Sequence, residues 1–296
     1  MGVALAEASS AARELFQEVD EALGQHLSRL MAEGPADQLT LTENAQPAIM
    51  ANALATLRVA EREAGLKLAD KADFVAGHSL GEYTALAAAE ALDVATTARL
   101  LRLRGQAMQA AVPVGEGTMA ALIGTELSDA QAVAVEAAQG EVCVAANDNA
   151  PGQVVVSGHK GAVERAIAIA KERGFKRALL LPVSAPFHSP LMEPAARAMA
   201  EALAGADLRP PIVPIYANVT AAPAGDPAEI RALLVQQVTG MVRWRESVTA
   251  MFEAGVTHFV EFGGKVLTPM IKRIAPDATT TSVVTMNDVE ALAKEI

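Results

Sequence analysis

Residues 73–83 of this 296-residue chain have the sequence Asp-Phe-Val-Ala-Gly-His-Ser-Leu-Gly-Glu-Tyr. The segment begins as a short apolar strand, turns abruptly at the Gly-x-Ser-x-Gly pattern of residues 77–81, and continues as an alanine-rich helix. Small residues around Ser79 permit a sharp strand-to-helix turn that exposes the serine hydroxyl at the carboxyl end of the strand. This context predicts that Ser79 is a nucleophile and that the Leu80 N–H faces a developing oxyanion. A tight turn with only a structural role is the alternative.

Alternating elements surround this segment. Apolar spacing predicts helices and strands in alternation on both sides of a central region, which is typical of a parallel sheet covered by helices. Residues 118–184 instead have the order β-α-β-β-α-β, which is typical of a ferredoxin-like unit. We therefore predict an α/β fold with a hydrolase-like large subdomain, residues 1–117 and 185–296, and an inserted ferredoxin-like small subdomain, residues 118–184.

The composition excludes several classes of protein. Hydrophobic residues make up 51% of the chain, and 24 Lys and Arg against 35 Asp and Glu give a net charge of −11, which does not attract nucleic acid. A single cysteine, Cys143, permits no internal disulfide and no multi-cysteine zinc site. No stretch has the roughly 18 to 20 uninterrupted apolar residues of a membrane span, and the first residues do not resemble a signal peptide. We expect a cytoplasmic monomer with no metal site and no bound cofactor.

A serine hydroxyl at neutral pH needs a base to take its proton, and histidine is the usual one. The chain has five histidines: His26, His78, His159, His188 and His258. His78 lies inside the turn, so its side chain should diverge from the serine, while His26 and His159 are expected at the surface and His258 at a strand edge. His188 stands where a strand ends and a helix begins, at another carboxyl edge. His188 is therefore the predicted base, with helix capping as the alternative.

Two arginines follow the nucleophile segment on a predicted helix. Arg102 and Arg104 are two residues apart and so point in different directions. One interpretation is that both are solvated. The other is that one of them enters the cleft and binds a substrate carboxylate through its planar guanidinium.

Further motifs extend the pattern along the chain. They are Gln46-Pro47-Ala48, Arg104-Gly105, Met108-Gln109, Asn149-Ala150-Pro151-Gly152-Gln153-Val154-Val155, Val183-Ser184-Ala185-Pro186-Phe187-His188, Pro214-Ile215-Tyr216-Ala217-Asn218-Val219 and Gly263-Gly264-Lys265-Val266-Leu267-Thr268. Together with residues 77–83, these motifs resemble, in order, those of the malonyl-CoA:acyl carrier protein transacylases. The resemblance runs from about residue 3 to the C-terminus and implies a hydrolase-like α/β subdomain with a ferredoxin-like insertion.

The resemblance also implies roles for individual residues. Ser79 corresponds to the acylated nucleophile and His188 to the base. Arg104 corresponds to the clamp that holds the carboxylate of the acyl group. Gln46 and Met108 are expected to line the substrate pocket.

Three further residues concern selectivity and the histidine. Phe187, directly before the histidine, resembles the malonyl-selecting form of the motif, since its bulk leaves little room for an α-methyl branch. Gln237 matches the residue whose backbone carbonyl orients the histidine, and Asn218 is expected beside the same ring. No triad acid is implied, because a carbonyl can hold the imidazole tautomer that a carboxylate holds elsewhere.

Two features depart from the family pattern. The family opens with an apolar strand and a Pro-Gly-Gln-Gly-Ser-Gln motif, whose glutamine N–H is a second oxyanion donor, and this sequence starts after that point. We expect a start codon assigned too late; the alternative is an impaired protein, because losing one oxyanion donor typically costs about 10²–10³ in turnover. Gly264 stands where the family usually has proline, which should loosen a turn without affecting the chemistry.

The expected activity is transfer of a malonyl group from malonyl-CoA to the phosphopantetheine thiol of acyl carrier protein, in fatty acid biosynthesis, by a ping-pong mechanism through malonyl-Ser79. A polyketide role is not distinguished from this by the sequence. Two alternatives stay open. One is a serine thioesterase or esterase, which would need an acid such as Asp93, Asp129 or Asp148. The other is a catalytically impaired homologue that binds acyl-CoA or carrier protein.

Overall fold

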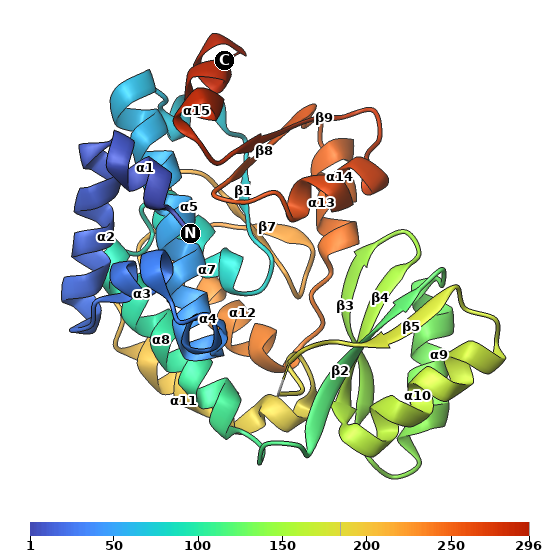
Figure 1. Cartoon of the computed structure of the whole chain (residues 1–296). Coiled ribbons are helices and arrows are strands. Elements are labelled where there is room, and N and C mark those ends of the chain that lie inside the picture. Colours follow the sequence, from blue (N-terminus) through green and yellow to red (C-terminus); the bar gives the residue numbers. More distant parts are fainter. Residues whose placement is uncertain (184, 296) are drawn as a thin grey trace.

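The chain folds into a large and a small body that meet along one side (Figure 1). This computed structural model describes residues 1–183 and 185–295. Ser184, the last residue of the predicted small subdomain, and Ile296 lie outside the described residues. Within the described part of the chain, no helix is both long and apolar enough to be a candidate membrane span.

The strands of the large body are short and mostly parallel. β1 (Val75–Ala76) pairs in parallel with β6 (Ile215–Ala217), and β7 (Ala222–Ala224) adds to β6 in antiparallel orientation. A second parallel pair is formed by β8 (His258–Phe262) and β9 (Thr279–Val283). The predicted parallel pairing is present, but among the described residues these strands form two separate hydrogen-bonded sheets rather than one.

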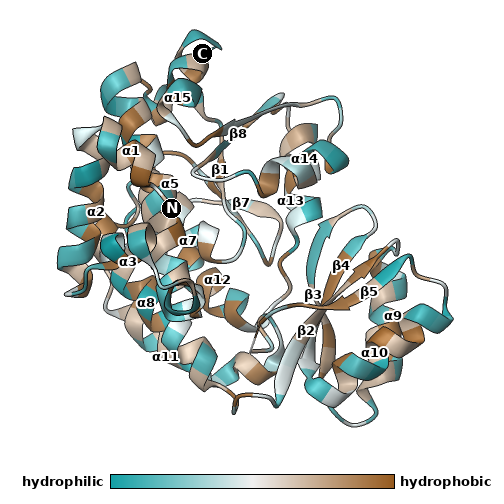
Figure 2. Ribbon diagram, viewed as in Figure 1, coloured by the Kyte–Doolittle hydropathy of each residue, from teal (hydrophilic) through white to brown (hydrophobic). Residues whose placement is uncertain are grey.

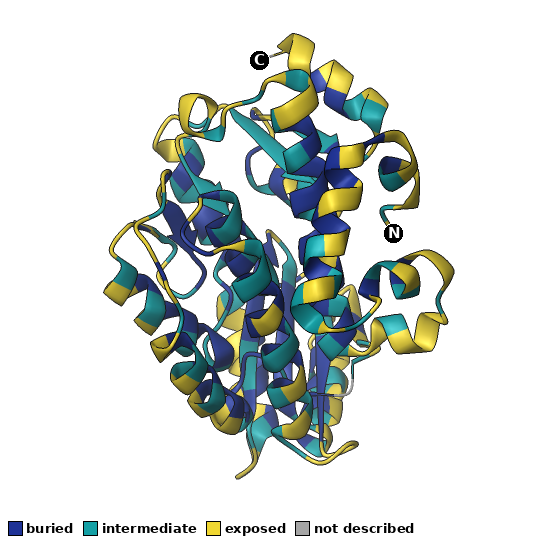
Figure 3. Ribbon diagram, turned by 90° about the vertical axis from the view of Figure 1, so that its left-hand side faces the viewer, coloured by how far each residue is buried: buried dark blue, intermediate teal, exposed yellow. Residues whose placement is uncertain are grey.

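Helices cover these strands, as the alternation of elements predicted. In chain order they are α1 (Val3–Ala8), α2 (Ser10–Leu23), α3 (Leu27–Glu33), α4 (Ala36–Thr40), α5 (Thr42–Ala64), α6 (Leu68–Lys71), α7 (Leu80–Ala88), α8 (Val94–Ala110), η1 (Pro190–Met192, a 3-10 helix), α11 (Glu193–Ala204), α12 (Pro227–Thr239), α13 (Trp244–Glu253), α14 (Leu267–Ile274) and α15 (Met286–Glu295). Their inner faces are buried and their outer faces exposed (Figure 3). Alanine, leucine and methionine supply most of the core that they enclose.

The crossing of α5 and α8 brings two site segments together. A Cβ at Gly105 on α8 would lie only 2.5 Å from the Glu43 Cα on α5, so the two backbones approach more closely than any side chain there would allow. Asp93 caps the start of α8 by accepting a hydrogen bond from the Thr96 N–H at 2.6 Å. This close crossing places Arg104, one residue before the glycine, beside Gln46 on α5.

The small body has the predicted β-α-β-β-α-β order. Its elements are β2 (Gly117–Ile123), α9 (Leu127–Ala138), β3 (Cys143–Ala150), β4 (Gln153–His159), α10 (Lys160–Glu172) and β5 (Arg177–Leu180). The four strands are antiparallel in the order β3-β4-β2-β5, and α9 and α10 pack on this sheet over an apolar core of alanine and valine. In Figure 2, β4 and β5 have mostly hydrophobic colours, whereas part of β3 is hydrophilic.

The hydrophilic end of β3 joins the two bodies. Asn147 forms a parallel bridge with Val242, and the Asp148 N–H donates to the Val242 carbonyl at 2.9 Å. Arg245 on α13 donates from Nε to the buried Asp148 carboxylate at 2.9 Å. These contacts fix the small sheet beside the carboxyl ends of β1 and β6.

Candidate active site

Ser79 lies in a strained turn between β1 and α7. It has φ 54° and ψ −109°, which is unusual for a residue with a side chain and costs of order 1–3 kcal/mol. Gly77 makes the turn possible, since a Cβ there would lie 1.9 Å from the Gly81 carbonyl oxygen. Leu80 is the first residue of α7, where backbone N–H groups have no acceptor within the helix. The turn therefore has the features of a nucleophile elbow: a partly exposed serine beside a free helix N-terminus.

His188 reaches the serine from a segment more than a hundred residues further along the chain. Its Nε2 lies 2.8 Å from the Ser79 Oγ, and the ring is 3% exposed. Its Nδ1 faces two carbonyl oxygens, that of Gln237 at 2.9 Å and that of Gly240 at 3.2 Å. Because carbonyls only accept, the hydrogen is on Nδ1 and the lone pair of Nε2 faces the serine hydroxyl.

The last turn of α12 takes the place of a triad acid. The final carbonyls of a helix accept no hydrogen bond from within the helix, and they lie at the negative end of its dipole. The Gln237 carbonyl belongs to that turn, so it can orient the imidazole and stabilise a positive charge on the ring. The carboxylates named in the hydrolase alternative lie elsewhere: Asp93 caps α8, Asp129 is in the first turn of α9, and Asp148 pairs with Arg245.

The environment keeps the His188 ring neutral. Burial, together with the nearby Arg104 charge, lowers the pKa of His188 to about 3. A histidine with so low a pKa is unprotonated at neutral pH and can accept a proton.

Arg104 contributes a buried cation beside the nucleophile. Its guanidinium donates from Nη2 to the Ser79 Oγ at 3.0 Å and to the Gln237 Oε1 at 2.8 Å, and from Nη1 to the Gln46 Oε1 at 2.8 Å. It is 1% exposed, and its Cζ lies 5.7 Å from the centre of the Tyr83 ring. Within the described part of the chain, its hydrogen-bond partners are all uncharged. The interpretation that one arginine enters the cleft thus applies to Arg104, whereas Arg102 is not hydrogen-bonded to these groups.

The other predicted substrate residues surround Arg104 and His188. Gln46 is buried on α5 and donates to the Met108 sulfur at 3.9 Å, so these two predicted pocket residues are in contact. Phe187 is half-buried directly before His188 and packs against the apolar clusters of both bodies. His188, Arg104 and Gln237 thus hydrogen-bond Ser79 directly, and Gln46 and Met108 adjoin Arg104 in turn.

Asn218 differs from its predicted place beside the histidine. Its side chain accepts a hydrogen bond from the Ser79 N–H at 2.7 Å and donates to the Gly77 carbonyl at 2.8 Å, and it does not hydrogen-bond His188. The pairing of the strands explains this position: β6 runs parallel to β1, so the residue that follows β6 lies next to the turn that follows β1. Asn218 braces the nucleophile turn, and its prediction as a histidine-orienting residue was wrong.

Glu82 is a buried residue of the site that the sequence analysis did not single out. It is 1% exposed, and its Oε2 accepts from the Asn218 N–H at 3.0 Å and the Gln237 Nε2 at 2.8 Å. Burial raises the pKa of Glu82 to about 7. The sequence does contain a pattern that indicates a role for Glu82: it is the lone acid in the first turn of an otherwise uncharged helix, directly after the Gly-x-Ser-x-Gly pattern.

The remaining histidines have structural surroundings. His78 points away from Ser79, as expected, with its Nε2 2.8 Å from the Asn149 Oδ1. His26 is exposed, and His258 lies at a strand edge with its Nε2 2.8 Å from the Thr281 Oγ1. His159 differs from the solvated residue predicted, because its Nδ1 accepts from the Val142 N–H at 2.9 Å.

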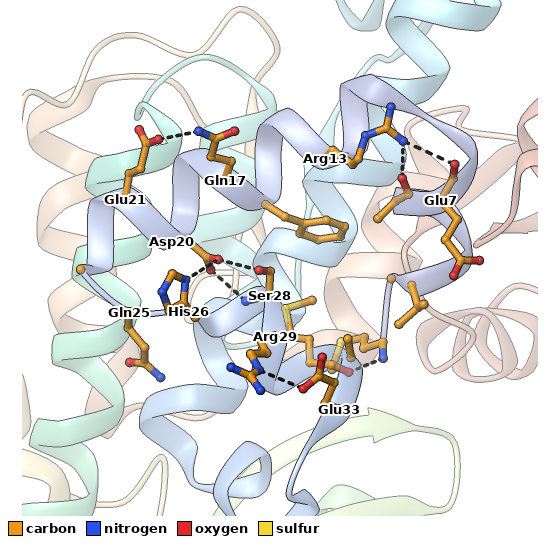
Figure 4. A pocket seen from close by; sticks show the side chains of 18 residues that line it. Glu7, Arg13, Gln17, Asp20, Glu21, Gln25, His26, Ser28, Arg29 and Glu33 are labelled. Carbon is orange, nitrogen blue, oxygen red and sulfur yellow. Dashed lines mark hydrogen bonds and ion pairs between the residues drawn. The ribbon is translucent and has the colours of Figure 1, made fainter.

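A hollow of about 810 Å³ lies apart from this site, among α1, α2 and α3 (Figure 4). Several of its polar side chains are paired: the Ser28 hydroxyl donates to the Asp20 carboxylate at 2.5 Å, and Arg29 and Glu33 form an exposed ion pair at 2.9 Å. None of the predicted site residues lines it. We therefore place the chemistry at Ser79 and not in this hollow.

A partly exposed serine hydrogen-bonded to a buried histidine at a nucleophile elbow, with a guanidinium in reach of the serine, defines a site for acyl transfer through a serine ester. The chain belongs to the acyl transferase domain family, whose sequence profile matches residues 1–274. It is 43% identical to a malonyl CoA-acyl carrier protein transacylase of Bacillus subtilis over 285 residues, which is 96% of this chain and 88% of that protein.

Solved structures agree with this membership. A crystal structure of an acyl-carrier-protein-S-malonyltransferase from Bartonella henselae has a TM-score of 0.97 and 53% identity, and the match covers 100% of this chain and 94% of that one. A second match is a chain in the structure of a type II PKS acyl-carrier protein in complex with its malonyl-transacylase. It has a TM-score of 0.96 and 38% identity, over 100% of this chain and 95% of that chain.

The low pKa of His188 gives a testable pH dependence. A base must be neutral to act, and a pKa of about 3 leaves Nε2 unprotonated throughout the neutral range. We predict that an uncharged fluorophosphonate labels Ser79 at a rate that changes by less than about twofold between roughly pH 5.5 and 8.5. Labelling is followed by intact mass, with Ser79→Ala as the unreactive control. An acid limb near the ordinary histidine value of about 6.5 would contradict the assignment.

Proposed function

We propose that this chain transfers a malonyl group from malonyl-CoA to the phosphopantetheine thiol of acyl carrier protein. The observation that carries the proposal is the buried Arg104 guanidinium, which hydrogen-bonds the Ser79 hydroxyl and has only uncharged partners among the described residues. An acyl group that ends in a carboxylate supplies an anion that can hydrogen-bond the guanidinium directly. The names of the relatives, which are malonyl transacylases, and the complex of one of them with its acyl-carrier protein support both substrates.

In the first half-reaction the serine becomes acylated. The Nε2 of His188 takes the Ser79 proton as Oγ attacks the thioester carbonyl, and the carbonyl π electrons move to its oxygen. The Leu80 N–H stabilises that oxyanion at the start of α7. When the oxyanion collapses, the bond to sulfur breaks, the protonated His188 returns the proton to the leaving thiolate, and coenzyme A departs as a thiol.

The second half-reaction reverses these steps with a different thiol. The phosphopantetheine thiol of the carrier protein gives its proton to the neutral His188 and attacks the malonyl-Ser79 ester. The tetrahedral intermediate collapses, the bond to the serine oxygen breaks, and the imidazolium returns the proton to Ser79. The reaction ends with malonyl carrier protein and the free serine.

Selectivity follows from the two residues that meet the acyl group. Arg104 binds the distal carboxylate and thereby positions the thioester carbonyl at Ser79. An acetyl group leaves this desolvated guanidinium without a charged partner, which disfavours its reaction. The Phe187 ring, packed between the two bodies, leaves little room for a branch next to the thioester carbonyl.

The proposed location is the cytoplasm, and the proposed pathway is fatty acid biosynthesis. Cys143, a buried free thiol, is consistent with a reducing compartment. Names of relatives that are malonyl transacylases support the pathway.

The acyl-enzyme is the direct test of this function. After mixing with malonyl-CoA, we predict an intact mass increased by one malonyl group on Ser79, followed by its loss to holo acyl carrier protein. Ser79→Ala should form no adduct. An adduct that is released as free malonate in preference to malonyl carrier protein would favour the thioesterase alternative, and a folded wild-type chain that forms no adduct would favour a non-catalytic binding protein.

We further propose that the carrier protein docks along β5, the edge strand of the small sheet. Lys176 and Arg177 are exposed there, and the next part of the strand exposes Leu179 and Leu180, at 53% and 50%. His188 follows Leu180 by eight residues in the sequence. Because the whole chain has a net charge of −11, an acidic partner needs a local cationic surface of this kind.

Charge reversal tests the docking surface. We predict that Lys176→Glu combined with Arg177→Glu raises the KM for acyl carrier protein by about 10-fold or more at low salt and leaves the KM for malonyl-CoA unchanged. The matched control is Arg29→Glu, an exposed arginine on α3 whose reversal should change neither constant. An unchanged KM for the carrier protein in the double variant would remove β5 from the docking surface.

A further inference from the structure

Glu82 is a buried carboxylate that the proton transfers described above do not use. It lies three residues after Ser79 and is the one charged residue of α7. A buried carboxylate costs several kcal/mol unless hydrogen bonds and nearby charges compensate for its lost solvation. Its position at the start of a helix compensates in part, since the helix dipole favours an anion there.

The contacts of Glu82 set the orientation of the Gln237 side chain. An ionised carboxylate only accepts hydrogen bonds, so Gln237 must present its NH₂ group, which donates to the Glu82 Oε2 at 2.8 Å. The same NH₂ group donates to the Ser79 carbonyl at 3.0 Å. The Gln237 Oε1 therefore faces the other way, where it accepts from the Arg104 Nη2 at 2.8 Å.

The reversed amide would not hold Arg104. With Gln237 turned over, its NH₂ group would face the Arg104 Nη2, so two donors would meet and the guanidinium would lose one of its acceptors. The hydrogen bond to the Ser79 carbonyl would be lost as well. Glu82 and the Ser79 carbonyl thus favour, through one amide, the direction that the guanidinium takes beside the nucleophile.

We propose that Glu82 is a positioning residue for substrate selection: through the Gln237 side chain it holds the Arg104 guanidinium in the direction that receives the carboxylate of the acyl group. The inference rests on the proposed function, because that function supplies the carboxylate-bearing acyl group. Glu82 does not touch the reacting atoms; it acts through Gln237.

The protonation state of Glu82 supports a measurable consequence. Burial raises its pKa to about 7, and the charge of Arg104 on α8 opposes that rise. The other titratable groups nearby are Tyr83 on the same helix and the rings of His78 and His188. Below about pH 7 the carboxyl is neutral, and its Oε2 accepts the hydrogen bonds of Asn218 and Gln237 less strongly than an ionised carboxylate does, so its hold on the amide weakens. Above about pH 7 the ionised form holds the amide more strongly.

The test uses two probes that react with Ser79. The first is malonyl-N-acetylcysteamine, a thioester that needs the guanidinium and has no phosphate that titrates near pH 7. The second is an uncharged fluorophosphonate, which does not need it. We predict that Glu82→Gln, which keeps an acceptor oxygen for Asn218 and Gln237 but removes the charge, lowers kcat/KM for the malonyl thioester by about 5- to 10-fold and fluorophosphonate labelling by less than about twofold.

A double-mutant cycle tests the route through Gln237. Gln237→Met, which keeps the backbone carbonyl that orients His188, should lower malonyl transfer at least as much as Glu82→Gln, and the double variant should be no worse than Gln237→Met alone. The wild-type kcat/KM for the malonyl thioester should rise with pH around a midpoint near 7, and Glu82→Gln should remain at the low plateau at every pH. The control is Thr84→Val on the same helix, whose buried hydroxyl has no partner among the described residues, and it should behave as wild type.

Several results would overturn the proposal: wild-type kcat/KM in folded Glu82→Gln, additive losses in the double variant, or equal losses with both probes. If Glu82→Gln does not fold, the wild-type pH profile decides, and a malonyl reaction with no limb near pH 7 counts against Glu82. A wild-type chain that reacts with the fluorophosphonate but never with the malonyl thioester overturns the proposed function instead.

Discussion

A buried guanidinium that is hydrogen-bonded only to uncharged groups among the described residues organises this site. Arg104 is held by two glutamine side chains and by the nucleophile itself, and each of these partners is uncharged. A cation kept out of water in this way is costly to the free protein, and an anion that reaches it recovers much of that cost. The same charge helps to keep His188 neutral and so ready to accept the serine proton. Binding and proton transfer therefore depend on one side chain.

The fold supplies the rigidity that such a cation requires. The close crossing of α5 and α8 at Gly105 holds Arg104 against Gln46, while the pairing of β1 with β6 places Asn218 against the strained turn at Ser79. Gln237, in the last turn of α12, contacts two site residues. Its backbone carbonyl accepts from His188, and its side-chain oxygen accepts from Arg104. Each functional group is fixed by a neighbour from a distant part of the sequence.

Much of this arrangement could be predicted from the sequence, because local patterns encode it. The small residues around Ser79 and the order of elements in residues 118–184 are such patterns. Asn218 and Glu82 show the limit. Their roles depend on which strands pair and on which buried groups meet, and no local spacing encodes either. The division of the large-body strands into two sheets is likewise a matter of tertiary pairing.

The central claim is that Arg104 selects the acyl group by its carboxylate. The direct measurement is the single-turnover rate of Ser79 acylation by malonyl-CoA and by acetyl-CoA, in the wild type and in Arg104→Met, with folding checked by circular dichroism. The wild type should prefer malonyl by about 100-fold or more, and the variant should lose that preference mainly through slower malonyl acylation. A folded variant that keeps the wild-type preference for malonyl would contradict the account.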